Sequence, residues 1–207
     1  MGWWTDRVVP RITDKVLDAP DVHEMRAQAC AGLSGRVLEI GFGSGLNADH
    51  YPPEVTSVAA VEPSDVGWRL AAERVSRLPI PVQRVGLDGQ RLSASDGEYD
   101  AVLSTFSLCT IPDVRRALAE IRRVLKSGGT FHFAEHGRAP EPAVARWQDR
   151  LEPLHRVVMG GCHLTRPIGD LVAEQLTVTD LETEYAPGPR ASRPFSFRYV
   201  GRAVAAS

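Results

Sequence analysis

Beyond residue 35, short apolar runs alternate along the chain with longer amphipathic stretches. Short runs rich in β-branched residues are typical of buried strands, and the stretches between them are typical of helices. We expect strands at residues 36–40, 56–61, 82–85, 101–105, 130–134, 177–183 and 196–203. This succession predicts an α/β fold, with a seven-stranded, mainly parallel sheet and helices on both faces.

The amphipathic stretches predict helices over residues 46–51, 64–77, 114–125 and 165–175, the third of them ended by Lys126-Ser-Gly-Gly129. Residues 141–161 interrupt the alternation and predict a helical insertion after the fifth strand, which would form a lid or a wall of the substrate site. Ahead of the sheet, apolar residues between positions 5 and 33 recur at helical spacing. The expected organisation is an N-terminal helical cap over residues 1–34 and a single globular unit over residues 35–207.

Composition narrows the choice of partners. The 207 residues are 43% apolar, enough for one compact domain with a sizeable core. With 24 basic and 26 acidic residues, the formal net charge of -2 lacks the basic excess that a phosphate backbone requires, so we expect no nucleic-acid partner. No apolar run approaches the ~18 residues of a membrane span, and we expect a cytoplasmic protein without an integral membrane segment. No pattern specifies an oligomeric state.

Three cysteines, Cys30, Cys109 and Cys162, lie far apart in the sequence. Neither a CxxC motif nor a paired Cys/His spacing accompanies them, so the spacing favours neither a disulfide framework nor a metal site. Free cysteines are most often small buried apolar groups, and we expect these to contribute to packing in a reducing compartment.

The strongest local motif is Val37-Leu-Glu-Ile-Gly-Phe-Gly-Ser-Gly45, which places three glycines between a buried strand and a helix. Glycine lets such a turn take positive φ and approach a bulky ligand closely. Glu62 ends the next strand, where a carboxylate can accept hydrogen bonds from both hydroxyls of a ribose. The G-x-G-x-G spacing differs from the G-x-G-x-x-G of dinucleotide enzymes, which argues against a nicotinamide oxidoreductase.

Three segments, Glu39-Ile-Gly-Phe-Gly-Ser-Gly45, Val61-Glu-Pro63 and Val124-Leu-Lys-Ser-Gly-Gly129, resemble the signature segments of class I S-adenosylmethionine-dependent methyltransferases. The resemblance implies their Rossmann-like fold, S-adenosyl-L-methionine as cofactor and S-adenosyl-L-homocysteine as product. It also places Asp88 beside the adenine; the alternative role for an aspartate before a glycine is to form a turn. The cofactor-binding residues implied in this way are Glu39, Gly41, Phe42, Gly43, Gly45, Asn47, Glu62, Pro63, Asp88, Gly89, Thr105, Phe106 and Leu108.

A second resemblance concerns the acceptor. The segments Phe133-Ala-Glu-His136, Leu151-Glu-Pro-Leu-His155 and Gly161-Cys-His-Leu-Thr-Arg166, together with Trp147 and the pair Leu108-Cys109, are similar to those of the small-thiol methyltransferase group. This match covers about residues 36–204 and implies a small-molecule acceptor with a thiol. A lipid amine, a quinone-like hydroxyl and a non-catalytic regulatory protein that binds the cofactor remain alternatives.

For a thiol acceptor, whose pKa is near 8.5, an imidazole could take the proton or favour the anion. The candidate catalytic residues are His136, at the ligand end of the fifth strand, and His163. Glu135 would orient His136 or satisfy a backbone amide. His163 could instead tie the inserted segment to the core. Trp147, with Trp3 and Trp4, could wall an apolar acceptor pocket.

Overall fold

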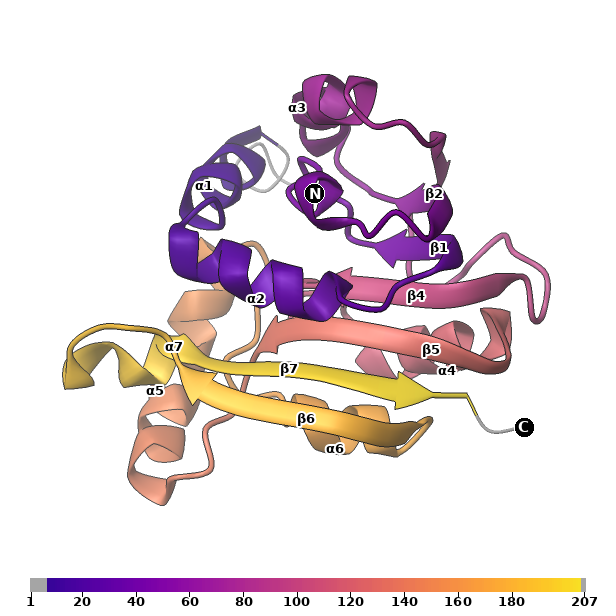
Figure 1. Cartoon of the computed structure of the whole chain (residues 1–207). Coiled ribbons are helices and arrows are strands. Elements are labelled where there is room, and N and C mark those ends of the chain that lie inside the picture. The colour runs from indigo at the N-terminus through magenta and orange to yellow at the C-terminus, as the bar shows by residue number, and fades with distance from the viewer. Residues whose placement is uncertain (1–6, 206–207) are drawn as a thin grey trace.

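The computed structural model describes residues 7–205, and its seven strands form one sheet, which is twisted (Figure 1). The strand order is β3-β2-β1-β4-β5-β7-β6; the first five are parallel, and β7 pairs antiparallel with both β5 and β6. This order confirms the predicted fold class, including the mainly parallel sheet. The strands are β1 (Gly35–Ile40), β2 (Val55–Val61), β3 (Val82–Gly86), β4 (Tyr99–Thr105), β5 (Leu125–His136), β6 (Thr177–Tyr185) and β7 (Phe197–Val204).

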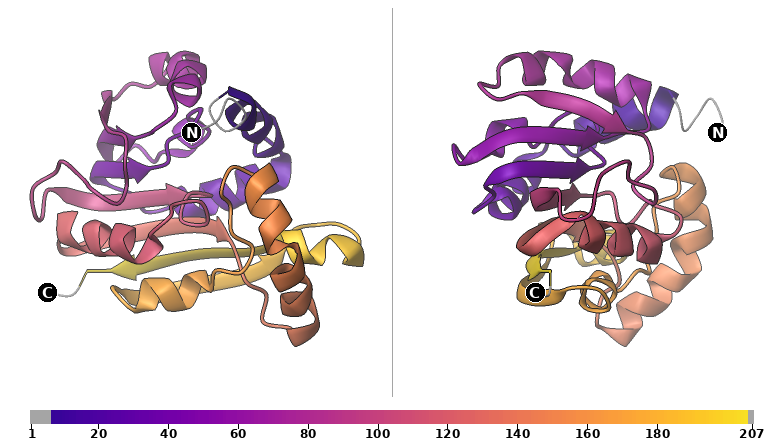
Figure 2. Two further views of the ribbon diagram at one scale, coloured as in Figure 1. Left: turned by 180° about the vertical axis from the view of Figure 1, so that it is seen from behind. Right: turned by 90° about the vertical axis from the view of Figure 1, so that its right-hand side faces the viewer.

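Helices cover both faces of this sheet, as the two further views show (Figure 2). One face carries α2 and α3, and the other carries α4 and α6. The helical insertion predicted after the fifth strand is present as α5, which lies with α1 at the end of the sheet to which β4 and β5 point. The helices are α1 (Val9–Val16), α2 (Pro20–Cys30), α3 (Asp65–Ser76), α4 (Val114–Val124), α5 (Pro142–Val158), α6 (Ile168–Ala173) and α7 (Arg193–Ser196), with 3₁₀ turns η2 (Ala48–His50) and η3 (Arg190–Ser192).

The core divides into two clusters because successive strand residues point to opposite faces. Along β4, Ala101 and Leu103 pack under α2 and α3, while Val102 between them packs under α4 and α6. All three are at most 1% exposed. A sheet buried on both faces holds its strand ends in fixed positions, and the ends of β1, β2, β4 and β5 carry most of the candidate site.

Two sequence-based expectations need correction. The helix predicted over 46–51 is only the turn η2, because Asn47 directs its amide into buried hydrogen bonds and Pro52 and Pro53 follow at once. The helix predicted over 114–125 is α4, which ends at Val124, but the strand predicted over 130–134 begins earlier, because residues 126–129 form the irregular start of β5. Within residues 7–205, no helix is long and apolar enough to cross a membrane. Trp3 and Trp4 lie outside the described residues.

Candidate active site

The glycine turn follows β1 at the point where the strand order reverses between β1 and β4, which is where open α/β sheets bind ligands. Gly41, Gly43 and Gly45 all have positive φ, of 73°, 57° and 76°. A Cβ at Gly41 would lie 1.8 Å from the Oγ of Ser107, so this position admits only glycine. A Cβ at Gly43 would meet nothing nearer than the Gly41 carbonyl at 3.9 Å, so the space beside Gly43 is open. The turn therefore presents bare backbone to an open space.

Phe42 contributes to the turn in a different way from the glycines. Its ring is 3% exposed, lies 5.5 Å from the ring of Trp68 in α3, and packs against the position where a Gly45 Cβ would stand. The side chain thus anchors the turn in the core, and only the Phe42 backbone remains for a ligand.

Glu62 directly follows β2 and supports the glycine turn from the side. Its carboxylate accepts hydrogen bonds from the backbone N–H groups of Gly43 and Ser64, each at 2.6 Å, and is 5% exposed. Burial raises the pKa of Glu62, and these two hydrogen bonds oppose the rise. A carboxylate has about four acceptor positions, so about two remain for further donors such as ribose hydroxyls. Pro63 follows Glu62 at the surface.

Beneath the turn lies a buried polar network, which explains the placement of three predicted residues. Asn47 donates to Glu39 at 2.9 Å and to the Thr105 hydroxyl at 3.0 Å, and Tyr51 donates to the other oxygen of Glu39. Burial raises the pKa of Glu39 to about 7, with hydrogen bonds from Tyr51 and Asn47 opposing it. Glu39, Asn47 and Thr105 therefore fix the floor of the site.

Arg26, in α2, joins this network and was not singled out by the sequence. Its Nη1 donates to Asn47 Oδ1 at 2.8 Å and to Thr105 Oγ1 at 2.7 Å, and its guanidinium lies 5.5 Å from the ring centroid of Phe106. Arg26 is 4% exposed, yet its buried Nε has no partner among the described residues. A buried, unpartnered donor is costly, which is consistent with a site that binds an anionic group.

The loop after β4 contributes the next part of the site. Phe106 has a positive φ of 53°, unusual for a residue with a side chain, and its N–H donates to Ala134 at 2.8 Å. Leu108 is fully buried, so its side chain belongs to the core. The carboxylate of Glu135 shapes this loop by accepting from the N–H groups of Ser107, Leu108 and Cys109, at 2.9, 2.9 and 3.3 Å. The prediction that Glu135 satisfies a backbone amide is confirmed.

Asp88 and Gly89 lie beyond the end of β3. A Cβ at Gly89 would come within 2.9 Å of Ile40, so the pair sits against the end of β1. Asp88 is exposed, and its Oδ1 accepts from both the backbone N–H and the side-chain amide of Gln90, at 2.9 Å each. These hydrogen bonds lower the pKa of Asp88. The geometry is that of an Asx turn, one of the two roles expected for Asp88.

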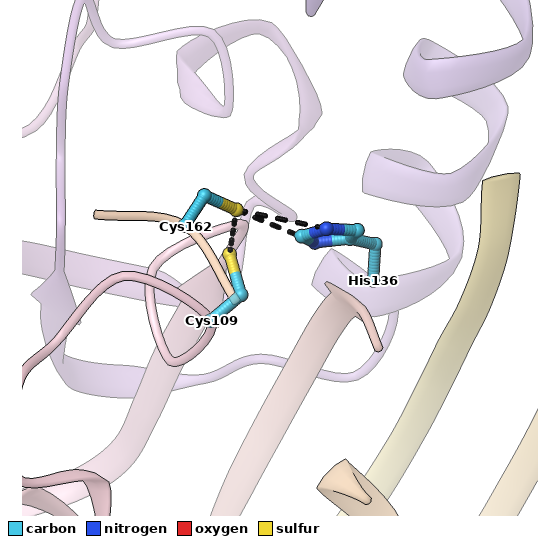
Figure 3. A group of neighbouring side chains, drawn as sticks. All are labelled: Cys109, His136 and Cys162. Carbon is cyan, nitrogen blue, oxygen red and sulfur yellow. Dashed lines mark hydrogen bonds between the residues drawn. The ribbon is translucent and has the colours of Figure 1, made fainter. Parts of the chain in front are cut away.

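The two candidate histidines have different surroundings. His136 ends β5, is half-buried, and lies 3.6 Å through Nε2 from the Sγ of Cys162 (Figure 3). Burial would lower the pKa of His136, but the neighbouring Cys109 and Glu135 raise it above its usual value. His163 instead contacts Glu152 of α5, with 2.5 Å between Nδ1 and Oε1. This contact ties the inserted segment to the loop that follows it.

The structure also brings together two cysteines that the sequence separates. Cys109 and Cys162 are free thiols, and their Sγ atoms lie 3.2 Å apart beside His136 (Figure 3).

Trp147, by contrast, is 54% exposed, with the Arg150 guanidinium 5.3 Å from its ring centroid. Trp147 therefore faces outward, whereas Cys109 and Cys162 lie beside His136.

The fold and this site define a class I S-adenosylmethionine-dependent methyltransferase, and similar proteins agree. Residues 38–133 match the methyltransferase domain family. Human thiol S-methyltransferase TMT1B is 34% identical over 182 residues, which are 84% of this chain and 72% of the human protein. The chain belongs to the family of this methyltransferase.

Two further similarities are more limited in what they show. Phosphatidylethanolamine N-methyltransferase of Cereibacter sphaeroides is 32% identical over 126 residues, 56% of this chain and 62% of that protein. The structure of the N-methyltransferase NodS from Bradyrhizobium japonicum, in complex with S-adenosyl-L-homocysteine, superposes with a TM-score of 0.72 at 15% identity, covering 98% of this chain and 99% of that one. At this identity, the likeness to NodS shows that the two proteins share one fold and shows nothing more.

The residues present also fit the cofactor of this class. Gly43, beside the open space, donates its N–H to Glu62, and Arg26, whose Nε has no partner among the described residues, contacts Asn47, two residues after Gly45. S-adenosylmethionine presents ribose hydroxyls and a carboxylate. The chain offers an acceptor for the hydroxyls, a cation for the carboxylate and bare backbone that the cofactor can approach closely.

Glu62→Ala is expected to weaken binding of S-adenosylhomocysteine by about 1.5 to 3 kcal/mol, the scale of hydrogen bonds to a charged acceptor. Isothermal titration calorimetry measures this directly. The matched control is Asp65→Ala, which removes a nearby carboxylate that is exposed and paired with Arg84. Equal affinity in both variants would remove Glu62 from the cofactor site.

Proposed function

We propose that the protein transfers the methyl group of S-adenosylmethionine to the sulfur of a small thiol. The observation that carries this proposal is the position of His136, half-buried at the end of β5 and within 3.6 Å of a sulfur atom. A site that already accommodates sulfur beside an imidazole suits a thiol acceptor. The relationship to thiol S-methyltransferase TMT1B supports the same acceptor class.

S-adenosylmethionine supplies a methyl group bound to a sulfonium, which is already activated for displacement. The chain then has to align the acceptor, exclude water and supply the acceptor as its anion. We assign the last task to His136, because a thiol with pKa near 8.5 is only a few per cent ionised at pH 7. The helix α5 lies at this end of the sheet, and we assign to it the role of covering the acceptor.

For the cofactor we propose two groups of residues. The first group contacts the cofactor and consists of Gly41, Gly43, Gly45, Glu62, Pro63, Asp88, Gly89, Phe106 and the backbones of Phe42 and Leu108. The second group supports the cofactor site from below and consists of Glu39, Asn47 and Thr105. His163 is proposed as a positioning residue, because its contact with Glu152 holds the segment that carries Cys162. The charge of -2 supports a protein without a nucleic-acid partner, and free cysteines support a cytoplasmic location.

The acceptor class is tested with three molecules that share one skeleton: 2-mercaptoethanol, ethanolamine and ethylene glycol. With methyl-labelled cofactor, we expect label only in the thioether formed from the thiol. Vesicles containing phosphatidylethanolamine and a demethylated quinone test the alternatives of a lipid amine and a quinone-like hydroxyl. Methylation of the amine, the lipid or the quinone with no thioether would overturn the thiol assignment.

A further inference from the structure

We propose that Cys109, His136 and Cys162 bind one zinc ion, whose fourth position receives the sulfur of the acceptor. The three residues come from the loop after β4, the end of β5 and the loop after α5, and their ligand atoms all lie within 4.8 Å of one another (Figure 3). Two sulfurs and one imidazole form a donor set that favours zinc. The role of the acceptor in this proposal rests on the proposed thiol methylation.

The distances agree with one ion between the three side chains. Zinc bonds of about 2.3 Å to sulfur and 2.0–2.1 Å to nitrogen place tetrahedral S and N ligands about 3.6 Å apart, and two S ligands about 3.8 Å apart. Cys162 Sγ and His136 Nε2 are 3.6 Å apart, and the two Sγ atoms are 3.2 Å apart. The sulfurs therefore need to separate by only about 0.6 Å to admit the ion.

The protein also holds the ligand segments in place from outside. Glu135 fixes the loop of Cys109 through three backbone N–H groups. The N–H of His163 donates to the Cys109 carbonyl at 2.8 Å, so the two cysteine loops are joined directly. Glu152 accepts from the Leu164 N–H at 2.7 Å and contacts His163. Such outer contacts orient metal ligands before the ion arrives.

Charge and an unused polar atom point to the same conclusion. Binding of Zn²⁺ releases one proton from each cysteine, and the ion with two thiolates is neutral, which suits a site where Cys109 is 1% exposed. The ring of His155 lies 5.9 Å from that of His136, and its buried Nε2 has no hydrogen-bond partner among residues 7–205. A buried nitrogen without a protein partner, on the ring next to His136, calls for a further molecule within hydrogen-bond reach of it, either water or a bound ligand.

Three protein ligands leave one position open, as in catalytic rather than structural zinc sites. The acceptor thiol binds there and loses its proton to solvent, because zinc deprotonates a coordinating thiol. Its sulfur forms a bond to the methyl carbon, and the bond from that carbon to the cofactor sulfur breaks, with the electron pair returning to that sulfur. The products are a neutral thioether, which leaves the ion, and S-adenosylhomocysteine.

The test begins with the full chain stripped of metal and titrated with zinc against a chromophoric chelator, with a phosphine as reductant. We expect about one zinc per chain, and at least 10²-fold weaker binding in Cys109→Ala, His136→Ala and Cys162→Ala. Cys30→Ala is the matched control, because Cys30 is a buried cysteine in α2 outside this cluster, and it should bind zinc as the parent does. Absent zinc binding, or equal loss in Cys30→Ala, would overturn the site.

Cobalt(II) in place of zinc reports the coordination itself. A thiolate-to-cobalt absorption band is expected on loading, and 2-mercaptoethanol should change it whereas ethylene glycol should not. An unchanged band would overturn acceptor coordination. If the metal-free protein methylates 2-mercaptoethanol at the full rate, the proposed role of zinc in binding the acceptor is wrong and the thiol function stands. If zinc binds but only the amine is methylated, the thiol function fails and the metal site stands.

Discussion

Gly43→Val is expected to lower the affinity for S-adenosylhomocysteine by more than 10²-fold while leaving the protein folded. Gly43 has φ of 57° and faces open space, so a side chain there would meet the ligand rather than the protein. Its N–H also donates to Glu62, and a distorted turn would move the carboxylate that we assign to the ribose. Calorimetry measures the affinity, and circular dichroism measures the fold.

The difficulty with this variant is that positive φ is strained for valine in any case, by roughly 1–2 kcal/mol. Gly97→Val provides the matched control, because Gly97 has φ of 63°, and a Cβ there would meet nothing nearer than 3.9 Å. Gly97 precedes β4, at the opposite end of that strand from the site. We expect both variants to lose similar thermal stability and only Gly43→Val to lose binding. Similar affinities in the two would place the cofactor elsewhere.

The sequence predicted those parts of the molecule that depend on local pattern. Strands and most helices follow from periodicity, and the glycine turn and Glu62 follow from their places at the ends of two strands. The short helix over 46–51 failed because tertiary hydrogen bonds of Asn47 and two prolines outweighed a weak helical pattern. Local propensity is a weak guide over six residues.

The remaining parts of the site depend on contacts between residues far apart in the chain. Arg26 is 21 residues from Asn47 and 79 from Thr105, and nothing in a helical pattern shows where its side chain goes. Cys162 is 53 residues from Cys109 and 26 from His136, so no local spacing indicated a metal site. The sequence carries only a weaker indication that these residues belong together: Cys109, His136 and Cys162 all lie in segments that resemble the small-thiol methyltransferase group.

His136→Ala is expected to lower methyl transfer to an aliphatic thiol by about 10²-fold or more at pH 7, the usual size of assistance by such a group. Cofactor affinity should barely change. Between pH 7 and the acceptor's pKa, the rate of the variant should rise about tenfold per pH unit, because the thiolate then forms without help. The parent should change little over this range. Initial rates at saturating cofactor give both profiles.

An aryl thiol, already largely ionised at pH 7, separates activation of the acceptor from its placement. If His136 acts only by promoting the thiolate, the variant should be nearly as fast as the parent with this acceptor. His163→Ala is the comparison within the same segment. Loss of its contact with Glu152 should raise KM and lower Tm, with a deficit that is the same for both acceptors at every pH. A His136→Ala deficit that persists at pH 9 and with the aryl thiol would assign His136 to placement of the acceptor, through packing or through the zinc ion, rather than to removal of its proton.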